Sequence, residues 1–444
     1  MELKRILIAN RGEIALRALR TIQEMGKEAI VVHSTADKDA LYVKYADASI
    51  CIGPPRSSDS YLNIPAIMSA AQISGADAVF PGYGFLSENQ NFAEICEKEG
   101  LKFIGPSTSA MALMSDKSKA KAFMKRAGVP VVPGSDGALK DVNEAKKLAE
   151  EIGYPVILKA AAGGGGRGMR VVNKPEDLEK NFWSAESEAL AAFGDGTMYI
   201  EKYFTSPRHI EVQILGDEHG NVVHIGERDC SLQRRHQKLI EESPAVILDE
   251  KTREELHEVA VKATKAIGYS SAGTFEFLYD RKDKKFYFIE MNTRLQVEHC
   301  VSEMVSGLDL IEWMIKIAEG KELLPQNKIK ISGHAIECRI TAEDPKSFVP
   351  SPGKITKYVA PAGRNVRMES HIYQGYNVPP FYDSMIGKLV VYDNNRDRAI
   401  SKMKVALDEL IIGGIKTTRD FHLQMMNNVD FLNNNYDTNY LSKH

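Results

Sequence analysis

Apolar positions in the first hundred residues follow two periods, one typical of strands and the other of helices. Residues 5–9 form a short apolar run, and residues 11–25 then carry apolar side chains near helical spacing until Gly26. Further apolar runs over 29–33 and 76–80 are typical of buried strands. Strand–helix–strand units at this spacing predict a parallel, doubly wound, Rossmann-like α/β sheet. Because this part lacks G-x-G-x-x-G, we expect it to be a scaffold that binds no nucleotide itself.

The pattern after residue 100 mixes helices and strands, as in an α+β protein. Ser107 is expected to cap one helix that reaches residue 127, where Gly128 and Pro130 interrupt the pattern. Strand-type alternation dominates from 198 to about 290. Further helices are predicted over 143–152, 250–267, 307–319 and 397–410, and further strands over 154–161 and 169–172. Pro325 and the polar run that follows it indicate a boundary, after which the chain is again rich in strand-type runs.

Composition and charge narrow the class of protein. Of 444 residues, 43% are apolar and 26% are charged, which is ordinary for a globular protein, and the net charge is −3. No global basic field exists, so we expect neither nucleic acid nor a membrane as a main partner. The first apolar run is too short for a signal peptide or a membrane span. Five cysteines without C-x-x-C spacing argue against a disulfide framework or zinc site and for the cytoplasm.

A glycine-rich loop over 163–168 reads GGGGRG and lies between two predicted strands. No Lys-Ser or Lys-Thr follows it, so it is not a Walker A loop. Each glycine costs roughly 0.5–1 kcal/mol of extra chain entropy relative to alanine, so five in six positions need a reason. A mobile flap whose N–H groups close over phosphates is one interpretation, and a flexible hairpin tip is the other. Lys159, which ends the preceding strand, is either a phosphate-binding cation or a solvated lysine.

Two strand-type runs, 272–279 and 285–290, each carry one glutamate among apolar residues. A hairpin centred on Asp283 would place Glu276 opposite Glu290, and like charges directly opposed on a sheet are destabilising. A divalent metal would remove the conflict, because Mg²⁺ commonly binds one or two carboxylates. Asn292 adds a neutral oxygen two residues on. The alternative is that both carboxylates lie on a solvated face.

The segment that follows, EMNTRLQVEH over 290–299, carries polar groups on alternate positions, which point to one face of an extended chain. Arg294 is able to bind a small anion bidentately, and Gln296 offers an amide. Glu298 is a candidate proton acceptor, with His299 as its support. A second polar run, RRHQK over 234–238, is either a solvated face or a site for phosphate or carboxylate. The acidic net charge and the lack of interleaved aromatic residues disfavour a nucleic-acid patch.

Nine motifs carry a resemblance to a known family. In chain order they read ANRGEIALR, FPGYGFLSEN, GGGGRGM, ERDCSLQRRHQK, GTFEFL, FIEMNTRLQVEH, ECRITAEDP, SPGKIT and YDSMIGKL, and they span about residues 4–416. Together they resemble the biotin carboxylases of the ATP-grasp superfamily. The resemblance implies an N-terminal doubly wound domain over 1–115 and an ATP-grasp domain over 116–330, with a mobile glycine-rich lid at about 131–203. It also implies a β-rich C-terminal domain over 331–444.

The resemblance also implies which residues bind nucleotide and metal. The implied ATP contacts are Lys117, Lys159, Gly164, Gly165, Gly166, Glu201, Lys202, Phe204, His209, Gln233, His236, Glu276, Leu278 and Glu290. Two Mg²⁺ or Mn²⁺ ions are expected, held by Glu276 and Glu290 with help from Asn292.

Bicarbonate and biotin are the implied substrates. Lys238, Arg294, Gln296, Val297 and Glu298 match the family's bicarbonate site. Among the implied catalytic residues, Glu298 is the base, Arg294 the catalytic arginine, Lys238 a neutralising cation, and Arg339 steadies the biotin enolate. Tyr83 is expected near biotin, and Arg20 matches an arginine of the family's dimer interface.

The implied reaction has two stages. Glu298 deprotonates bicarbonate, which attacks the γ-phosphoryl group of ATP to give carboxyphosphate. Carboxyphosphate yields CO₂ and phosphate, the phosphate deprotonates biotin N1′, and the enolate captures CO₂. This is the first half-reaction of acetyl-CoA carboxylase, which supplies malonyl-CoA for fatty acid synthesis.

The expected partners are a biotin carboxyl carrier protein, carboxyltransferase subunits and a second copy of the chain. Biotin is expected on a separate protein, because Met403-Lys404 falls in a predicted helix and not in an A-M-K-M hairpin. Two positions depart from the family pattern. Cys300 stands where many relatives have proline, which is expected to change backbone stiffness only, and Phe204 stands where many have leucine.

Three alternatives remain at this stage. One is the biotin carboxylase subunit of a pyruvate or another acyl-CoA carboxylase. Another is an ATP-grasp amide ligase or a carbamoyl-phosphate-type synthetase. That alternative does not explain why RRHQK, QVEH and ECRITAEDP occur together in one chain. The third is a non-catalytic ATP-binding protein, which is expected to have lost Glu290, Arg294 or Glu298, and all three are present.

Overall fold

The structure is a computed structural model that describes residues 2–160 and 168–443. Its chain forms two compact units. The larger contains the residues up to Ala120, then Arg208–Phe277 and everything from Glu290 onward. The smaller contains Lys121–Pro207 and Leu278–Ile289. No helix in the described part is long and apolar enough to cross a membrane.

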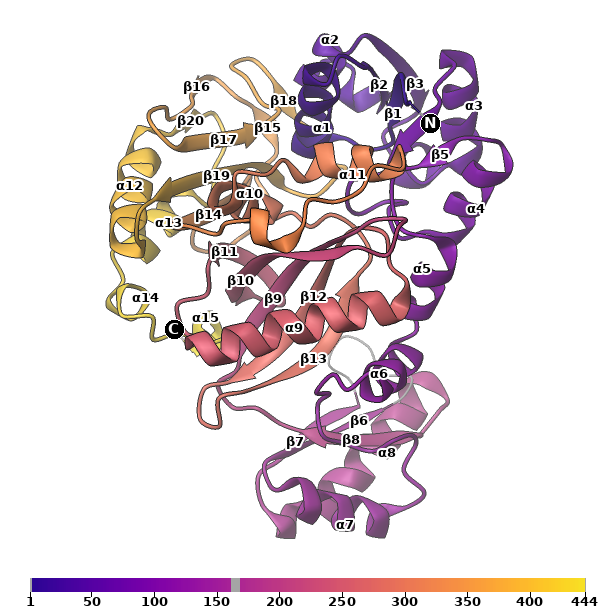
Figure 1. The fold of residues 1–444 in the computed structure, drawn as a ribbon. Helices are drawn as coiled ribbons and strands as arrows, with labels where there is room; N and C mark the ends of the chain where they lie inside the picture. Colours follow the sequence, from indigo (N-terminus) through magenta and orange to yellow (C-terminus); the bar gives the residue numbers. More distant parts are fainter. Residues whose placement is uncertain (1, 161–167, 444) are drawn as a thin grey trace. The chain divides into compact units, whose positions relative to one another are not determined.

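The N-terminal part of the larger unit is the predicted doubly wound sheet (Figure 1). Five parallel strands lie in the order β3-β2-β1-β4-β5. They are β1 (Arg5–Ile8), β2 (Glu28–Ser34), β3 (Ala48–Gly53), β4 (Ala78–Phe80) and β5 (Lys102–Phe103). The helices here are α1 (Gly12–Glu24), α2 (Leu41–Tyr45), α3 (Ile64–Ser74) and α4 (Gln90–Lys98). The pattern missed β3, which is mostly exposed, and β5, which has two residues.

An eight-stranded sheet, most of whose residues belong to the larger unit, has the order β13-β12-β9-β10-β11-β14-β19-β17. The strands are β9 (Arg208–Gly216), β10 (Val222–Arg234), β11 (Gln237–Ser243), β12 (Ser271–Asp280), β13 (Lys285–Asn292), β14 (His334–Thr341), β17 (Val366–Ser370) and β19 (Met385–Asp393). Helix α9 (Glu250–Ile267) packs on β9 and β10, and α12 (Arg396–Glu409) packs on β19 and β14 (Figure 1). The strands of the C-terminal region therefore extend the sheet of the middle region.

One hydrophobic core joins these two sheets within the larger unit. Ile6 and Ile8 of β1 contribute to the same buried cluster as Ile336 of β14 and Leu389 of β19. Leu7, between them in sequence, belongs to a second cluster on the other face of β1. Successive side chains of β1 thus point to opposite faces of the sheet, and both faces are covered. This is what the continuous apolar run over 5–9 predicted for a buried strand.

Shorter elements complete the larger unit. They are β15 (Gly353–Lys354), β16 (Lys357–Val359), β18 (Asn377–Val378), β20 (Ile411–Gly413), α10 (His299–Ser306), α11 (Leu310–Ala318), α13 (Arg419–Met426), α14 (Val429–Leu432) and α15 (Tyr440–Lys443). Composition gave no expectation for the asparagine-rich tail, yet it is anchored. The buried Arg208 guanidinium donates to the carbonyl oxygens of Asn434 (3.2 Å) and Tyr436 (3.0 Å). Met403 is buried in α12, so Met403-Lys404 is helical as predicted.

The smaller unit contains a three-stranded antiparallel sheet in the order β7-β6-β8. Its strands are β6 (Val156–Ala160), β7 (Met169–Val172) and β8 (Met198–Lys202), with helices α7 (Val142–Ile152) and α8 (Leu178–Phe193). Val156, Leu158, Phe182 and Ile200 belong to its own buried core. The predicted ATP contacts Gly164, Gly165 and Gly166 lie outside the described residues, so those predictions remain as they were.

The single helix predicted over 107–127 is wrong. Two helices replace it, α5 (Thr108–Ser115) and α6 (Lys117–Arg126), because Asp116 between them is extended, with φ −88° and ψ 104°. The Asp116 carboxylate accepts hydrogen bonds from the N–H groups of Ser118 (3.1 Å) and Lys119 (3.0 Å). This is the geometry of an N-cap, so Asp116 begins a new helix at Lys117.

A two-residue turn connects β10 to β11, since Arg234 pairs with Gln237. Arg235 and His236 form the turn with φ of 50° and 66°, the left-handed region that a type I′ hairpin turn requires. An L-residue other than Gly, Asn or Asp pays roughly 1–2 kcal/mol there. The predicted basic run therefore lies on a strained hairpin.

We expect Arg235→Asn to raise the free energy of unfolding by about 0.5–1 kcal/mol, because asparagine tolerates a positive φ. Arg235→Val is the matched control and should lower it, since a branched β-carbon fits this region worst. Calorimetric melting temperatures of the two variants test this. Equal shifts of the same sign would contradict the assignment of strain to this turn.

Candidate active site

Lys238 on β11 is the centre of a cluster of buried acidic side chains. Its Nζ lies 2.6 Å from a carboxylate oxygen of Glu211, 2.9 Å from one of Glu276 and 2.6 Å from one of Glu298. The Gln296 side-chain oxygen accepts a further hydrogen bond from it at 3.2 Å. The cluster thus contains predicted site residues from three separate segments of the chain, and Glu211, which the sequence analysis did not single out.

The bends in β10 explain how these residues meet. Lys238 is on β11, whereas Glu211 is on β9 and Glu276 on β12, and β10 lies between. The pairing of β10 with both neighbours shifts register, between His224 and Glu227 on one side and between Asp229 and Gln233 on the other. Bulges bend a strand and increase its twist, which curls the sheet and brings side chains of non-adjacent strands together.

Electrostatics keep the cluster charged. Burial alone would lower the pKa of Lys238, but the three carboxylates hold that pKa well above its ordinary value. Burial alone would raise the pKa of Glu276, but Lys238 and then His209 hold it well below its ordinary value. His209 lies 3.2 Å from Glu276, and this carboxylate raises the pKa of His209 to about 9 against the effect of burial. Its imidazole is therefore a cation at neutral pH.

Glu298 is held between two cations. One carboxylate oxygen contacts Lys238, and the other accepts a hydrogen bond from Nη2 of Arg339 at 3.0 Å. Burial would raise the pKa of Glu298, but Lys238 and Arg339 bring it below its ordinary value. The side chain is thus an ionised hydrogen-bond acceptor at neutral pH, the state that a general base requires.

Contacts bring together part of the polar face predicted for 290–298, although the strand ends at Asn292. The Asn292 and Gln296 amides both donate to Glu276 Oε1, at 3.0 and 2.9 Å. Arg294 Nη2 donates to the Asn292 side-chain oxygen at 2.9 Å. The direct opposition of Glu276 and Glu290 stays a prediction. Glu290 is half-exposed, and its carboxylate lies 3.3 Å from Lys117 Nζ.

Glu88 is a site residue that the sequence analysis missed. Its two carboxylate oxygens accept from Nε of Arg294 (2.8 Å) and from the backbone N–H of Thr293 (3.1 Å). Glu88 lies inside the quoted motif FPGYGFLSEN, and this was the signal in the sequence that could have identified it. Glu88 thus connects the N-terminal sheet to the arginine expected to bind bicarbonate.

Carboxylate and amide groups suitable for a divalent cation lie around Glu276. Carboxylate oxygens of Glu211 and Glu276 lie within 4.8 Å of one another, and the Asn292 amide touches Glu276. Carboxylate and amide oxygens are the donors that Mg²⁺ prefers. The residues predicted to hold the metal therefore have suitable chemistry.

Further predicted ATP contacts lie in the smaller unit. Glu201 accepts from Lys159 at 2.5 Å and from Lys121 at 2.9 Å. Burial would raise the pKa of Glu201, but Lys159 and Lys121 lower it. Lys202 donates to the carbonyl oxygens of Gly153 (2.9 Å) and Tyr154 (3.2 Å).

The remaining predicted ATP contacts lie on strands and turns of the two units. In the smaller unit, the Phe204 ring packs on Tyr287 with centroids 5.1 Å apart, and Leu278 lies near the end of β12. In the larger unit, Gln233 is paired with Lys238 across the hairpin, and His236 is on its tip.

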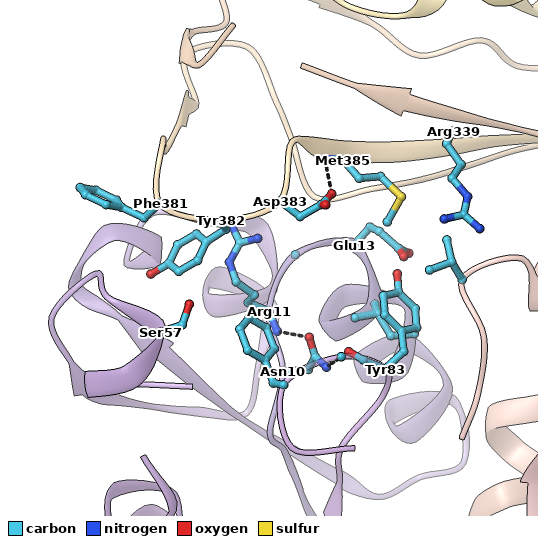
Figure 2. A pocket seen from close by; sticks show the side chains of 15 residues that line it. Asn10, Arg11, Glu13, Ser57, Tyr83, Arg339, Phe381, Tyr382, Asp383 and Met385 are labelled. Carbon is cyan, nitrogen blue, oxygen red and sulfur yellow. Dashed lines mark hydrogen bonds between the residues drawn. The ribbon is translucent and has the colours of Figure 1, made fainter. Parts of the chain in front are cut away.

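A pocket of about 450 Å³ adjoins Glu298 through Val297 and Arg339, which both line it (Figure 2). Tyr83 forms part of its wall and follows Pro81 and Gly82. The Asn10 amide donates to the carbonyl oxygens of Pro81 (2.7 Å) and Tyr83 (2.8 Å), which fixes this turn. The predicted placement of Tyr83 and Arg339 around one space is thus observed.

His299 and Cys300 begin α10 and are buried. Burial and the nearby Lys388 lower the pKa of His299 well below its ordinary value, so its ring is neutral. Its Nδ1 lies 2.8 Å from the Gln296 carbonyl oxygen, and it therefore supports the loop before Glu298. Burial raises the pKa of the Cys300 thiol. Cys300 follows the helix start directly, a position where proline is also tolerated.

Comparisons with known proteins decide the family. Models of the biotin carboxylase N-terminal domain, the ATP-binding domain of the carbamoyl-phosphate synthase L chain, and the biotin carboxylase C-terminal domain match residues 2–111, 116–326 and 337–443. Biotin carboxylase of Pseudomonas aeruginosa is 54% identical over 443 residues, 99% of this chain and 98% of that protein. This chain belongs to the biotin carboxylase family. Members of this family are ligases that form a C–N bond and use ATP, Mg²⁺ and biotin.

A pyruvate carboxylase subunit and two solved structures are also similar to this chain. A pyruvate carboxylase subunit of Methanothermobacter thermautotrophicus is 52% identical, over 99% of this chain and 90% of that protein. A Campylobacter jejuni biotin carboxylase–βγ-ATP complex is 76% identical, with a TM-score of 0.92 over 100% of this chain and 99% of that one. A third structure is the biotin carboxylase domain dimer of Hydrogenobacter thermophilus 2-oxoglutarate carboxylase, in complex with MgADP, ADP and bicarbonate. It is 48% identical, with a TM-score of 0.89, and the match covers 100% of this chain and 98% of that one. The predicted three-part fold class is confirmed.

Behind Arg339 lie two buried carboxyl groups to which the sequence analysis assigned no role. Glu241 on β11 and Glu337 on β14 are directly paired across the sheet and fully buried. Arg339 Nε donates to Glu241 at 2.6 Å, whereas neither oxygen of Glu337 has a hydrogen-bond partner among the described residues. Burial raises the pKa of Glu241 to about 7 and that of Glu337 well above its ordinary value. Glu337 is therefore a neutral acid beside the hydrogen-bonded side chains of Glu241 and Arg339.

We expect Glu337→Gln to become stabilising relative to the native chain as pH rises. A carboxyl whose folded pKa is raised contributes stability below its unfolded pKa of about 4.3, and this is lost as pH rises towards the folded pKa. The glutamine amide does not titrate, so Glu337→Gln keeps its stability as pH rises. The melting temperature of the variant minus that of the native chain should therefore be larger at pH 8 than at pH 5.

Glu369→Gln is the matched control, on the same sheet. Burial would raise the pKa of Glu369, but Arg367 and Arg17 lower it, so this carboxylate stabilises at high pH. Its replacement should cost nearly the same melting temperature at pH 8 as at pH 5, because both lie above the unfolded pKa of about 4.3. Parallel pH trends in the two variants would show that Glu337 is ionised in the folded state.

Proposed function

We propose that this chain carboxylates biotin borne by a biotin carboxyl carrier protein, with ATP and bicarbonate, as the first half-reaction of acetyl-CoA carboxylase. One observation carries the proposal. Glu298 lies between Lys238 and Arg339, and Arg339 lines the pocket that Tyr83 also lines. This arrangement supports a base at Glu298, between a cation suited to a small anion and a pocket suited to a second substrate.

Bicarbonate is proposed to bind Lys238, Arg294, Gln296 and the backbone of Val297. The ammonium of Lys238 and the fork of Arg294 attract an anion, and the Gln296 amide orients it. Glu298 then accepts the bicarbonate proton at the carboxylate oxygen that contacts Lys238 or at the one that contacts Arg339. Its lowered pKa keeps Glu298 ionised at neutral pH, so that it is able to accept a proton.

ATP is proposed to contact Lys117, Gln233, His209, His236, Glu276 and Glu290 of the larger unit, and Lys159, Glu201, Lys202, Phe204 and Leu278 of the smaller one. Glu276 and Glu290, with Asn292, would hold Mg²⁺ or Mn²⁺, which supplies neutralisation of phosphate charge when bound. The lysines position the γ-phosphoryl group, because phosphoryl transfer is catalysed mainly by positioning and electrostatics. Release from Glu201 would free Lys159 for phosphate.

Biotin is proposed to occupy the pocket between Tyr83 and Arg339. Carboxyphosphate formed beside Glu298 yields CO₂ and phosphate, and this phosphate removes the proton of biotin N1′. The Arg339 guanidinium then stabilises the negative charge on the ureido oxygen as N1′ attacks CO₂. Since Nε and Nη2 of Arg339 are already bonded to Glu241 and Glu298, its orientation is set before biotin arrives.

The carrier protein, carboxyltransferase subunits and a second copy of the chain are proposed partners, in the cytoplasm. The dimer named for the 2-oxoglutarate carboxylase domain supports the last of these. Arg20, expected at the dimer interface, is half-exposed and lies 3.5 Å from Glu369. A keto-acid carboxyltransferase is the alternative partner, because a pyruvate carboxylase subunit is 52% identical and a biotin carboxylase 54%.

Phosphate release from ATP tests the proposal directly. We expect release that requires bicarbonate and that increases when free biotin is added, because carboxyphosphate forms only from bicarbonate and biotin draws off the CO₂. Purified protein with MgATP, assayed with each substrate omitted in turn, gives the measurement. Release that is indifferent to both bicarbonate and biotin would reject biotin carboxylation.

Arg294→Ala is expected to lower biotin carboxylation by about 100-fold or more, the scale of losing one positioned donor at a developing charge. ATP should still bind, since Arg294 contacts Glu88 and Asn292 and no predicted phosphate ligand. Glu88→Gln is the milder companion, because it keeps a hydrogen-bond acceptor while removing the ion pair. Native turnover in Arg294→Ala, with ATP affinity measured by calorimetry, would show that the bicarbonate site lies elsewhere.

A further inference from the structure

Lys388 on β19 is a fully buried lysine that no step above uses. Its Nζ donates a hydrogen bond to the carbonyl oxygen of Val297 at 2.7 Å and forms an ion pair with Glu13 at 3.2 Å. The ammonium also lies 5.8 Å from the centroid of the Tyr83 ring. It therefore contacts the loop before Glu298, the first turn of α1 and the turn that carries Tyr83.

Burial of this ammonium needs compensation. The effective penalty for burying an ion in a protein is several kcal/mol, and it is recovered only with good charge and hydrogen-bond partners. Glu13 is buried as well, and apart from Lys388 no other ion pair to its carboxylate is found among the described residues. Burial would lower the pKa of Lys388, but Cys300 and then Glu13 keep it raised, so the ammonium is charged. Burial raises the pKa of Glu13 and the nearby Lys388 opposes this, so the charge of the Glu13 carboxylate depends on Lys388.

The bond to Val297 fixes the geometry of the proposed base. The carbonyl oxygen of Val297 and the N–H of Glu298 belong to one planar peptide group. Holding that oxygen therefore sets the plane from which the Glu298 side chain departs, at φ −80° and ψ 11°, directly before α10. Val297 also lines the pocket together with Glu13 and Tyr83. The Lys388 side chain thus links the Val297–Glu298 peptide to Glu13 and Tyr83 in the pocket wall.

We propose that Lys388 is a positioning residue that holds the Val297–Glu298 peptide at a fixed distance from the Glu13 and Tyr83 wall of the pocket, so that base and pocket keep one geometry. The inference rests on the proposed function, because it concerns how that reaction is aligned. Lys388 touches no reacting atom in this scheme. Its contribution is alignment, and a displacement of about 1 Å in an active site costs on the order of 100-fold in rate.

Lys388→Met tests this, because methionine keeps much of the volume and removes the ammonium. We expect the KM for bicarbonate to rise about 10-fold and kcat for biotin carboxylation to fall roughly 10- to 100-fold. The KM for ATP should stay within about twofold, since none of the contacts of Lys388 involves a predicted ATP ligand. This split between bicarbonate and ATP is a readout that a general loss of stability would not produce.

Lys27→Met is the matched control. Lys27 Nζ also donates to a backbone carbonyl, that of Leu3 at 2.6 Å, and pairs with a carboxylate, that of Glu319 at 2.6 Å. Its side chain is only 10% exposed, and neither partner lies at the site. This variant should lose melting temperature while its kinetic constants stay native.

A double variant, Glu13→Gln with Lys388→Met, keeps the test valid if the single variant folds poorly. Removing both charges should restore melting temperature, because no unpaired carboxylate is left buried, yet the raised KM for bicarbonate should persist. Kinetic constants for Lys388→Met and the double variant that match those of Lys27→Met would overturn the inference while the proposed function stands. A native chain whose phosphate release ignores bicarbonate would instead reject the proposed function itself.

Discussion

The meeting of one ammonium group with three buried carboxylates is the interaction on which the site depends. Glu211, Glu276 and Glu298 would repel one another without Lys238, and β10, which lies between β9 and β11, shifts register on both edges. A carboxylate left alone in this interior would take up a proton, and a neutral acid is neither a base nor a metal ligand. The charge of Lys238 therefore sets the protonation state of the groups around it.

Around that cluster the larger unit carries a buried polar layer instead of a purely apolar core. Glu241, Glu337 and Arg339 lie on neighbouring strands of one sheet, and Arg339 is paired in register with Lys388. Partly satisfied polar layers are costly, so a chain keeps one only where several groups must be held in one orientation. Here the oriented groups are the proposed base and the arginine beside the pocket.

Sequence reasoning found the parts of the site that local pattern encodes. Alternation over 290–298 identified Asn292 and Gln296 as neighbours on one face, and both contact Glu276. Glu211 is a single charged residue without a local pattern, and Glu88 and Lys388 lie inside quoted motifs that do not reveal their contacts, which appear only when strand order is known. Asp116 was missed for another reason, since helical apolar spacing continued across it while its carboxylate capped a second helix.

The eight-stranded sheet crosses the predicted boundary near residue 330 without interruption, since β11 and β14 pair along four residues each. That continuity has a consequence for the evolution of such chains. A C-terminal segment expressed alone would present the N–H and C=O groups of β14 as a bare edge, which invites aggregation. The region is thus inseparable from its neighbour as a unit of genetic exchange, and recombination that preserves folding should fall outside this pair of strands.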